Sequence, residues 1–255
     1  MVGIIGNGHV GGAMKKLFED AVVYDKYKGY ITREQINECD IAFVCVPTPM
    51  ADDGHCDTTA VDEVLDWCTT KVIVIRSTVP VGYTERKKKE LGKRIVFQPE
   101  YYGETHHHPL ADLRNRTWIT LGGSAEDTAE VVKEYQKVYT ADVEIVKTDA
   151  STAEMAKYME NCFYATKVTF CNEMYDIAKK CGVDYDELRE VWLKDPRISR
   201  SHTFVYEDNR GYGGSCLPKD IAALAYISEE CGVNHDLLDA VIKKNNYVKG
   251  NAYGD

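Results

Sequence analysis

Short apolar runs alternate with longer amphipathic segments through the first part of the chain. The runs are rich in valine and isoleucine and occupy residues 2–6, 21–25, 41–46, 72–78, 94–98 and 118–123. The sequence between them predicts two helix starts, TREQ at 32–35 and SAED at 124–127. In each, a hydroxyl side chain precedes an amide or acidic residue by three positions, which is typical of a helix N-terminus. Parallel strands joined by crossover helices are typical of this alternation. It predicts an α/β domain at residues 1–147 with a doubly wound parallel sheet.

The pattern changes near residue 151. Residues 151–182 contain no proline, and their only glycine is the last, Gly182, which suits a helix C-cap. This segment predicts one long helix. Two further helical patterns cover residues 184–193 and 221–232. The second domain, residues 148–255, is therefore predicted to be all-helical.

The long helix is also predicted to join two copies of the chain. About thirty helical residues span about 45 Å, more than a domain of this size needs. Large side chains fall on more than one face of this helix. They are Tyr158, Phe163, Val168, Phe170 and Tyr175. We expect a homodimer.

Composition and charge exclude several classes of partner. The 255-residue chain has a formal net charge of −10, and its densest cationic run, at 85–90, is flanked by glutamates. Nucleic acid is therefore not expected as a partner. No charged leader precedes an apolar run, and no stretch approaches the roughly 18 apolar residues of a membrane span. We expect a soluble, cytoplasmic protein with no membrane partner.

Cysteine and histidine usage gives no sign of a metal centre. The nine cysteines are scattered without C-x-x-C spacing, which favours free thiols in a reducing compartment. Three histidines stand together at 106–108, but consecutive side chains diverge and no further ligand is spaced near them. We expect no metal.

A glycine-rich turn follows the first apolar run. Gly6, Gly8 and Gly11 form G-x-G-x-x-G, in which the first glycine permits a tight turn and the second lets the backbone approach a pyrophosphate at a helix N-terminus. Asp25 ends the next apolar run, where a carboxylate accepts hydrogen bonds from the adenosine ribose and repels a 2′-phosphate. These residues predict a Rossmann-like domain that binds NAD rather than NADP.

A second candidate site lies in RGYGGSCLPKD, residues 210–220. Cys216 precedes Pro218, a residue typical of helix starts, so its thiol would lie near exposed N–H groups and Lys219, both of which stabilise a thiolate. Gly213 and Gly214 leave room for a substrate. A half-buried cysteine at a helix start explains Cys216 equally well, so both interpretations stay open.

The long helix offers groups that complement a nucleophile. Lys157 and Asn161 are four residues apart, hence on one face, where a cation and an amide together can hold an oxyanion. Asp220 can orient a proton or a lysine. A solvated helix face is the alternative for the lysine and asparagine, and a dipole-favoured first-turn residue for the aspartate.

Six stretches together resemble the nucleotide-sugar dehydrogenases, the UDP-glucose/GDP-mannose 6-dehydrogenase family. They are GNGHVG (6–11), DIAFVCVPTP (40–49), STVPVG (77–82), QPEYYGE (98–104), AKYMENCFYATKVTFCNE (156–173) and GYGGSCLPKD (211–220). The resemblance implies an NAD-dependent four-electron oxidation of a sugar C6 alcohol to the uronate, through a cysteine thiohemiacetal and thioester. UDP-glucose is the expected nucleotide sugar and GDP-mannose the alternative.

The resemblance also implies a role for each matching residue. The catalytic residues it implies are Cys216, Lys157, Asn161, Asp220, Glu104 and Thr78. The NAD contacts are Gly6, Gly8, Gly11, Asp25, Thr48, Thr78 and Lys219. The substrate contacts are Glu100, Lys157, Asn161, Gly213 and Arg197, the last of them reaching the site of a neighbouring subunit. The chain ends where the family continues into a third, nucleotide-sugar-binding domain, so a short form is expected.

Two other functions stay open from the sequence. A two-domain hydroxyacid dehydrogenase also joins a dinucleotide fold to a helical domain, but it leaves residues 211–220 without a function. A non-catalytic, nucleotide-binding dimerising remnant is consistent with the short length, but it leaves the set of candidate catalytic residues unexplained.

Overall fold

The structure is a computed structural model, and it describes residues 1–102, 112–139 and 142–250. The chain forms two compact units. The first contains residues 1–51 and 56–157, and the second contains residues 52–55 and 158–255. The domain boundary at 147/148 stays a prediction.

The first unit is built on a seven-stranded sheet of order β2-β1-β3-β4-β5-β6-β7. The strands are β1 (Val2–Ile5), β2 (Val22–Tyr24), β3 (Ile41–Val44), β4 (Val72–Ile75), β5 (Ile95–Phe97), β6 (Trp118–Gly122) and β7 (Glu144–Thr148). Every residue of β1, β3 and β4 is buried, as expected for parallel strands covered on both faces. The predicted doubly wound sheet is confirmed.

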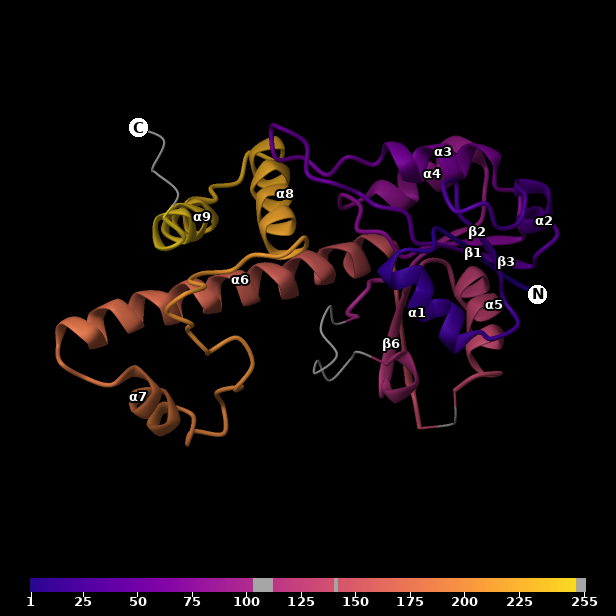
Figure 1. The fold of residues 1–255 in the computed structure, drawn as a ribbon. Helices are drawn as coiled ribbons and strands as arrows, with labels where there is room; N and C mark the ends of the chain where they lie inside the picture. The colour runs from indigo at the N-terminus through magenta and orange to yellow at the C-terminus, as the bar shows by residue number, and fades with distance from the viewer. Residues whose placement is uncertain (103–111, 140–141, 251–255) are drawn as a thin grey trace. The chain divides into compact units, whose positions relative to one another are not determined.

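Helices cover both faces of this sheet, as Figure 1 shows. One apolar cluster joins the sheet to α1 and α5, and a second joins it to α2, α3, α4 and the start of α6. The helical elements of this unit are α1 (His9–Leu17), α2 (Arg33–Asn37), α3 (Thr59–Trp67), α4 (Tyr83–Leu91), η1 (Leu113–Asn115) and α5 (Ala125–Tyr135). The capping residues expected from the sequence are confirmed, because Thr32 accepts a bond from the Gln35 N–H and Ser124 accepts one from the Asp127 N–H.

The sheet differs from the sequence prediction at its far edge. The prediction of parallel pairing is wrong for β6, which runs antiparallel to β5, while β7 is parallel to β6. A hydrophobic run marks a strand but carries no direction. The sequence analysis also missed β7, an edge strand whose residues are exposed or only half-buried, so that no apolar run marks it.

Helix α6 (Ala150–Lys180) begins against the sheet and is 31 residues long, which confirms the predicted long helix. A Cβ atom at Gly122, the last residue of β6, would lie 2.7 Å from the Ala153 Cβ and 2.9 Å from the Ala150 Cα. Only glycine on the strand and small residues on the helix allow this approach. The buried carboxylate of Glu154 then accepts hydrogen bonds from the N–H groups of Gly82 (2.6 Å) and Thr84 (2.9 Å), and so caps α4.

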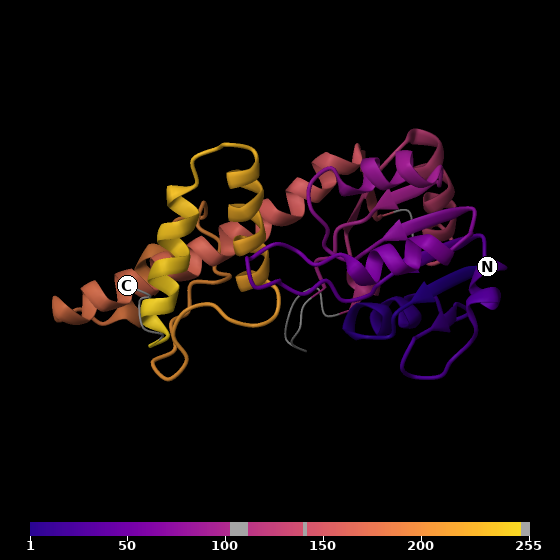
Figure 2. The same ribbon diagram turned by 90° about the horizontal axis from the view of Figure 1, so that it is seen from above.

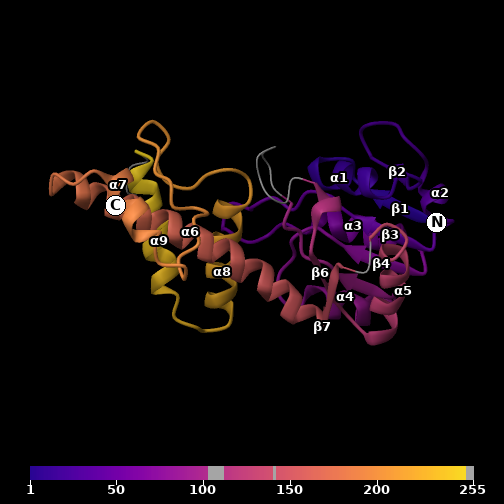
Figure 3. The same cartoon turned by 90° about the horizontal axis from the view of Figure 1, so that it is seen from below.

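The second unit surrounds the rest of α6. Helices α8 (Leu217–Glu230) and α9 (Asp236–Val248) pack on each other and on α6 through a core that includes Cys162, Ala165 and Ile221 (Figures 2 and 3). Helix α7 (Tyr185–Trp192) follows Gly182, whose φ of 72° suits the predicted helix end. The sequence analysis missed α9, because only Val241 and Asn245 are buried on it and its apolar face is short.

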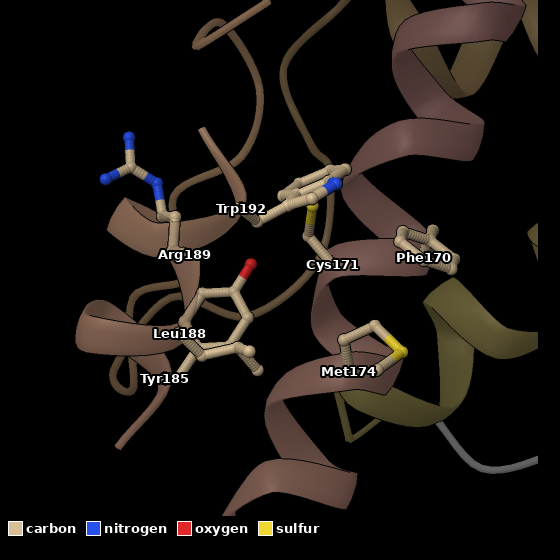
Figure 4. Close-up of a pocket in the computed structure, with 7 residues that line it drawn as sticks. All are labelled: Phe170, Cys171, Met174, Tyr185, Leu188, Arg189 and Trp192. Atoms are coloured by element: carbon tan, nitrogen blue, oxygen red, sulfur yellow. The ribbon is translucent and has the colours of Figure 1, made fainter. Parts of the chain in front are cut away.

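An apolar pocket of about 180 Å³ lies between α6 and α7. Figure 4 shows the side chains that line it, which come from both helices: Phe170, Cys171, Met174, Tyr185, Leu188, Arg189 and Trp192. Burial raises the pKa of Cys171 and of Tyr185, so both remain protonated at neutral pH. The pocket contains none of the predicted site residues.

Two further properties concern the described part of the chain. None of its helices, including α6, combines the length and the apolarity needed to cross a bilayer. Within residues 1–102, 112–139 and 142–250, no three His, Cys, Asp or Glu side chains are grouped so as to hold a metal ion. The three histidines at 106–108 lie outside these ranges.

Replacing Glu154 by alanine is expected to destabilise the fold by about 1–3 kcal/mol, because two buried N–H groups lose their acceptor. Urea unfolding measures this loss. Glu173→Ala, at an exposed position of the same helix, is the control and should change the free energy of unfolding by less than about 0.5 kcal/mol. Equal effects of the two substitutions would contradict the capping role.

The effect of Glu154→Ala should also depend on pH. Burial raises the pKa of Glu154 above its ordinary value of 4.5, although the bonds from Thr84 and Gly82 oppose this. A raised folded-state pKa adds stability that is complete below the unfolded-state pKa and is lost as the pH rises through the folded-state value. The loss on substitution should therefore be larger near about pH 4 than near about pH 7. A loss independent of pH would show that the carboxyl titrates normally.

Candidate functional site

The carboxyl ends of β1 and β3 form the switch point of the sheet. The chain passes from β1 to β2 on one side and then crosses to β3 on the other, and ligands of open α/β sheets bind at such a point. Gly6 follows β1 with φ of 91°, and a Cβ there would lie 2.8 Å from the Cys45 carbonyl oxygen. A Cβ at Gly11 would lie 1.8 Å from the Gly6 oxygen. Both glycines are required by the tight packing of the turn itself.

Gly8 is different, because its Cβ position is open. Among the described residues, apart from the chain neighbours of Gly8, no atom lies within 4 Å of that position, and Gly8 is the N-cap of α1. Gly8 has no side chain to cap the helix, so the first-turn N–H groups of α1 begin next to this open space. A pyrophosphate fits such a cradle, since it needs backbone donors, a positive helix end and no intervening side chain.

Asp25 connects the end of β2 to the glycine-rich turn. Its carboxylate accepts hydrogen bonds from the N–H groups of Asn7 (2.8 Å), Tyr27 (3.0 Å) and Lys28 (3.1 Å). Burial alone would raise the pKa of Asp25, but these donors and the charge of Lys28 hold it below its ordinary value. A carboxylate has about four acceptor positions, so one remains for a ribose hydroxyl.

The segments that follow β3 and β4 are joined by a hydrogen bond. The Ser77 hydroxyl donates a hydrogen bond of 2.6 Å to the Val46 carbonyl oxygen. This bond fixes the neighbouring Thr78, which is half-buried, beside the segment that carries buried Thr48. The structure thus places both threonines in the segments that follow the carboxyl ends of β3 and β4.

Cys216 is the N-cap of α8, and it is exposed. The Cys216 side chain makes no capping hydrogen bond to α8, and Pro218 is the second residue of this helix. The Ser215 hydroxyl lies 3.6 Å from the Cys216 sulfur. The predicted position of the thiol at a helix N-terminus is therefore observed, and the alternative of a half-buried cysteine does not fit its exposure.

The first turn of α8 is bonded to α6. The Asn161 amide donates a hydrogen bond of 2.5 Å to the Asp220 carboxylate, whose other oxygen pairs with the Lys219 ammonium. Asp220 is fully buried. Burial and the charge of Asp220 raise the pKa of Cys162 to about 12, so this neighbouring thiol is inert. Asn161, Asp220 and Lys219 thus form one bonded group in the unit that carries Cys216.

The loop before Cys216 is held by two asparagines that the sequence analysis missed. The Asn245 side chain accepts a bond from the Tyr212 N–H (2.7 Å) and donates one to the Tyr212 carbonyl oxygen (3.2 Å). The Asn172 oxygen accepts a bond from the Gly211 N–H (3.1 Å). Gly213 is exposed, and its predicted substrate contact stays a prediction. Asn172 lies in the stretch 156–173 and Asn245 lies in none of the six stretches. The bonding partners of both are distant in the chain, so only the folded structure identifies these contacts.

Lys157 lies one turn of α6 before Asn161, and its side chain is buried to 8% exposure. Its Nζ lies 5.0 Å from the centre of the Tyr101 ring, on the ring's face. Ala150, Ala153, Glu154 and Lys157 follow one another at helical spacing, so the face of α6 that packs on the sheet also carries the lysine.

Glu100 is held inside the first unit. Its carboxylate pairs with the buried guanidinium groups of Arg76 and, at 2.7 Å, of Arg116. The predicted substrate contact of Glu100 stays a prediction. Glu104 lies outside the described residues. Arg197 is highly exposed and pairs with Asp195, and its predicted reach to a neighbouring subunit also stays a prediction.

Comparisons with known proteins agree with this arrangement. Residues 12–141 match the NAD binding domain of the UDP-glucose/GDP-mannose dehydrogenase family, and residues 151–247 match its central domain. UDP-glucose 6-dehydrogenase TuaD of Bacillus subtilis is 32% identical over 82% of this chain and 47% of its own length. GDP-mannose 6-dehydrogenase of Pseudomonas savastanoi is 29% identical over 99% of this chain and 62% of its own length.

Solved structures give the same result. A UDP-glucose dehydrogenase from Pyrobaculum islandicum superimposes with a TM-score of 0.85 at 26% identity, over 96% of this chain and 68% of that one. The chain spans about half to two thirds of the length of these relatives. Since two successive domain matches cover most of its residues, the chain belongs to the UDP-glucose/GDP-mannose dehydrogenase family.

Proposed function

We propose that this chain oxidises the C6 alcohol of a nucleotide sugar to the carboxylate in two NAD-dependent steps, with Cys216 as the nucleophile. The observation that carries the proposal is the exposed thiol at the N-terminus of α8, in the same unit as the bonded group of Asn161, Asp220 and Lys219. First-turn N–H groups favour the thiolate form of such a cysteine.

The side chains have defined tasks in this reaction. The cradle at Gly8 would hold NAD, which would supply the hydride acceptor for each of two oxidations. Between them the Cys216 thiolate adds to the aldehyde carbon, forming a C–S bond, and the carbonyl oxygen becomes an alkoxide that takes up a proton. Lys157 and Asn161 hold the oxygen that bears the developing negative charge. After the second oxidation water attacks the thioester, and the C–S bond breaks to release the acid and the thiolate.

UDP-glucose is the proposed sugar nucleotide, and GDP-mannose is the alternative. Relatives named for each of these sugars match the chain. Covalent attachment to Cys216 does not distinguish the two substrates, because the thiol reacts at C6 of the sugar and not at the nucleotide.

The proposal predicts two NADH for each molecule of sugar consumed. Absorbance at the NADH band, with NAD and UDP-glucose or GDP-mannose, measures the ratio. Cys216→Ala should abolish this two-to-one ratio, because the aldehyde is no longer captured for the second oxidation. Cys231→Ala, which removes an exposed thiol at the other end of α8, is the control and should retain it. No NADH with either sugar, while NAD still binds, would favour the non-catalytic remnant.

The cofactor site makes a separate prediction. Gly8→Ala adds a methyl group to open space, so the melting temperature should change by less than about 2 °C, while the Kd for NAD rises about tenfold or more. Gly11→Ala places its Cβ against the Gly6 oxygen and should lower the melting temperature itself. Calorimetry and thermal unfolding measure the two effects. Unchanged NAD binding by Gly8→Ala would contradict the cradle.

We further propose that α6 forms a homodimer. Met159, Phe163, Phe170 and Ile177 are each about half or more exposed, and their spacing places them on one side of the helix. Light scattering at micromolar concentration should give the mass of a dimer, and Phe163→Asp should shift it toward the monomer. Val233→Asp, at another exposed apolar position, is the control and should leave the dimer intact. A wild-type monomer would refute the proposal.

A further inference from the structure

Residues 99–102, the PEYY segment, contact three parts of the first unit. Glu100 pairs with Arg76 and Arg116. Tyr101 faces Lys157, and the Tyr102 ring lies 4.5 Å from the His9 ring at the start of α1. Three successive residues thus join a buried charge cluster, the candidate catalytic lysine and the helix that opens the cofactor cradle.

The Tyr101 ring lies close to a second aromatic side chain as well as to Lys157. Trp118, the first residue of β6, lies with its ring centre 6.1 Å from that of Tyr101, at an interplanar angle of 32°. The Lys157 Nζ is 5.0 Å from the same ring. The Tyr101 ring therefore lies close to both a tryptophan ring and an ammonium, and these two neighbours restrict its rotation.

The ion pairs of Glu100 with Arg76 and Arg116 fix the backbone next to Tyr101. Arg76 and Arg116 are each about 5% exposed or less, and both reach the Glu100 carboxylate, which also accepts a bond from the Tyr102 N–H. The position of Tyr101 is therefore set by ion pairs on the residue before it. Buried pairs of this kind are costly to break, because removal of one partner leaves an uncompensated charge.

A ring face suits a lysine that must serve an oxyanion. Taking an ammonium out of water is unfavourable, and an aromatic face compensates part of that cost. The Tyr101 face attracts the Lys157 cation without adding an opposite charge beside it.

We propose that Tyr101 is a positioning residue for Lys157, acting through the face of its ring and not through its hydroxyl. Glu100 anchors the segment that presents this ring. The inference rests on the role proposed above for Lys157, and it assigns a task to a residue that stands outside the set of candidate catalytic and binding groups.

Two measurements on matched variants test this proposal. Tyr101→Leu should lower kcat about five- to thirtyfold with a smaller change in KM for the sugar nucleotide, and Tyr101→Phe, which keeps the ring face, should restore kcat to within about threefold. Competitive labelling of lysines by acetic anhydride, read by peptide mass spectrometry, should show Lys157 slow to react in wild type and Tyr101→Phe and faster in Tyr101→Leu.

The labelling does not require turnover, so it separates this inference from the proposed reaction. A wild type without activity but with the expected labelling pattern would refute the reaction and support the contact. Tyr247→Leu removes a similar contact, with Lys244 at 5.3 Å from the ring, and should change the labelling of Lys244 and not of Lys157. Equal kcat in Tyr101→Phe and Tyr101→Leu, or unchanged Lys157 labelling in Tyr101→Leu, would overturn the proposal.

Discussion

The close approach of α6 to strand β6 at Gly122 is the contact on which the candidate site depends. The absence of a Cβ on that residue lets Ala150 and Ala153 lie against the sheet, and Glu154 then caps α4. Lys157 follows one turn later on the same helix, so this approach also sets the position of the lysine in the first unit. A steric fit at one glycine thus determines where a candidate catalytic group stands.

Helix N-termini divide into two kinds in this protein. Helices α2, α5 and α7 are capped by their own Thr32, Ser124 and Asp184, while α1 and α8 begin at Gly8 and Cys216 without a side-chain cap. Helices α3 and α9 also lack one, so an absent cap is not a functional mark by itself. The open space at Gly8 and the exposed thiol at Cys216 are what distinguish α1 and α8.

Local sequence signals account for much of the fold, because caps, glycine turns and buried β-branched runs act over a few residues. They predicted the start of α2 at Thr32, the end of α6 near Gly182 and the location of Cys216 at a helix start. The direction of β6 and the weakly apolar β7 and α9 carry no such signal. For the same reason the asparagines at 172 and 245 and the contact between residues 101 and 157 were missed, since they depend on partners distant in the chain.

The bonds that hold the Tyr212 loop also have a consequence for folding. Its partners Asn172 and Asn245 lie 39 residues before Gly211 and 33 residues after Tyr212, on α6 and α9. Each bond requires the loop to meet the helix that carries the asparagine, and closing the chain between them costs conformational entropy. The segment that leads to the reactive thiol therefore has no local means of holding its shape, and its order depends on two helices that are distant from it in the sequence.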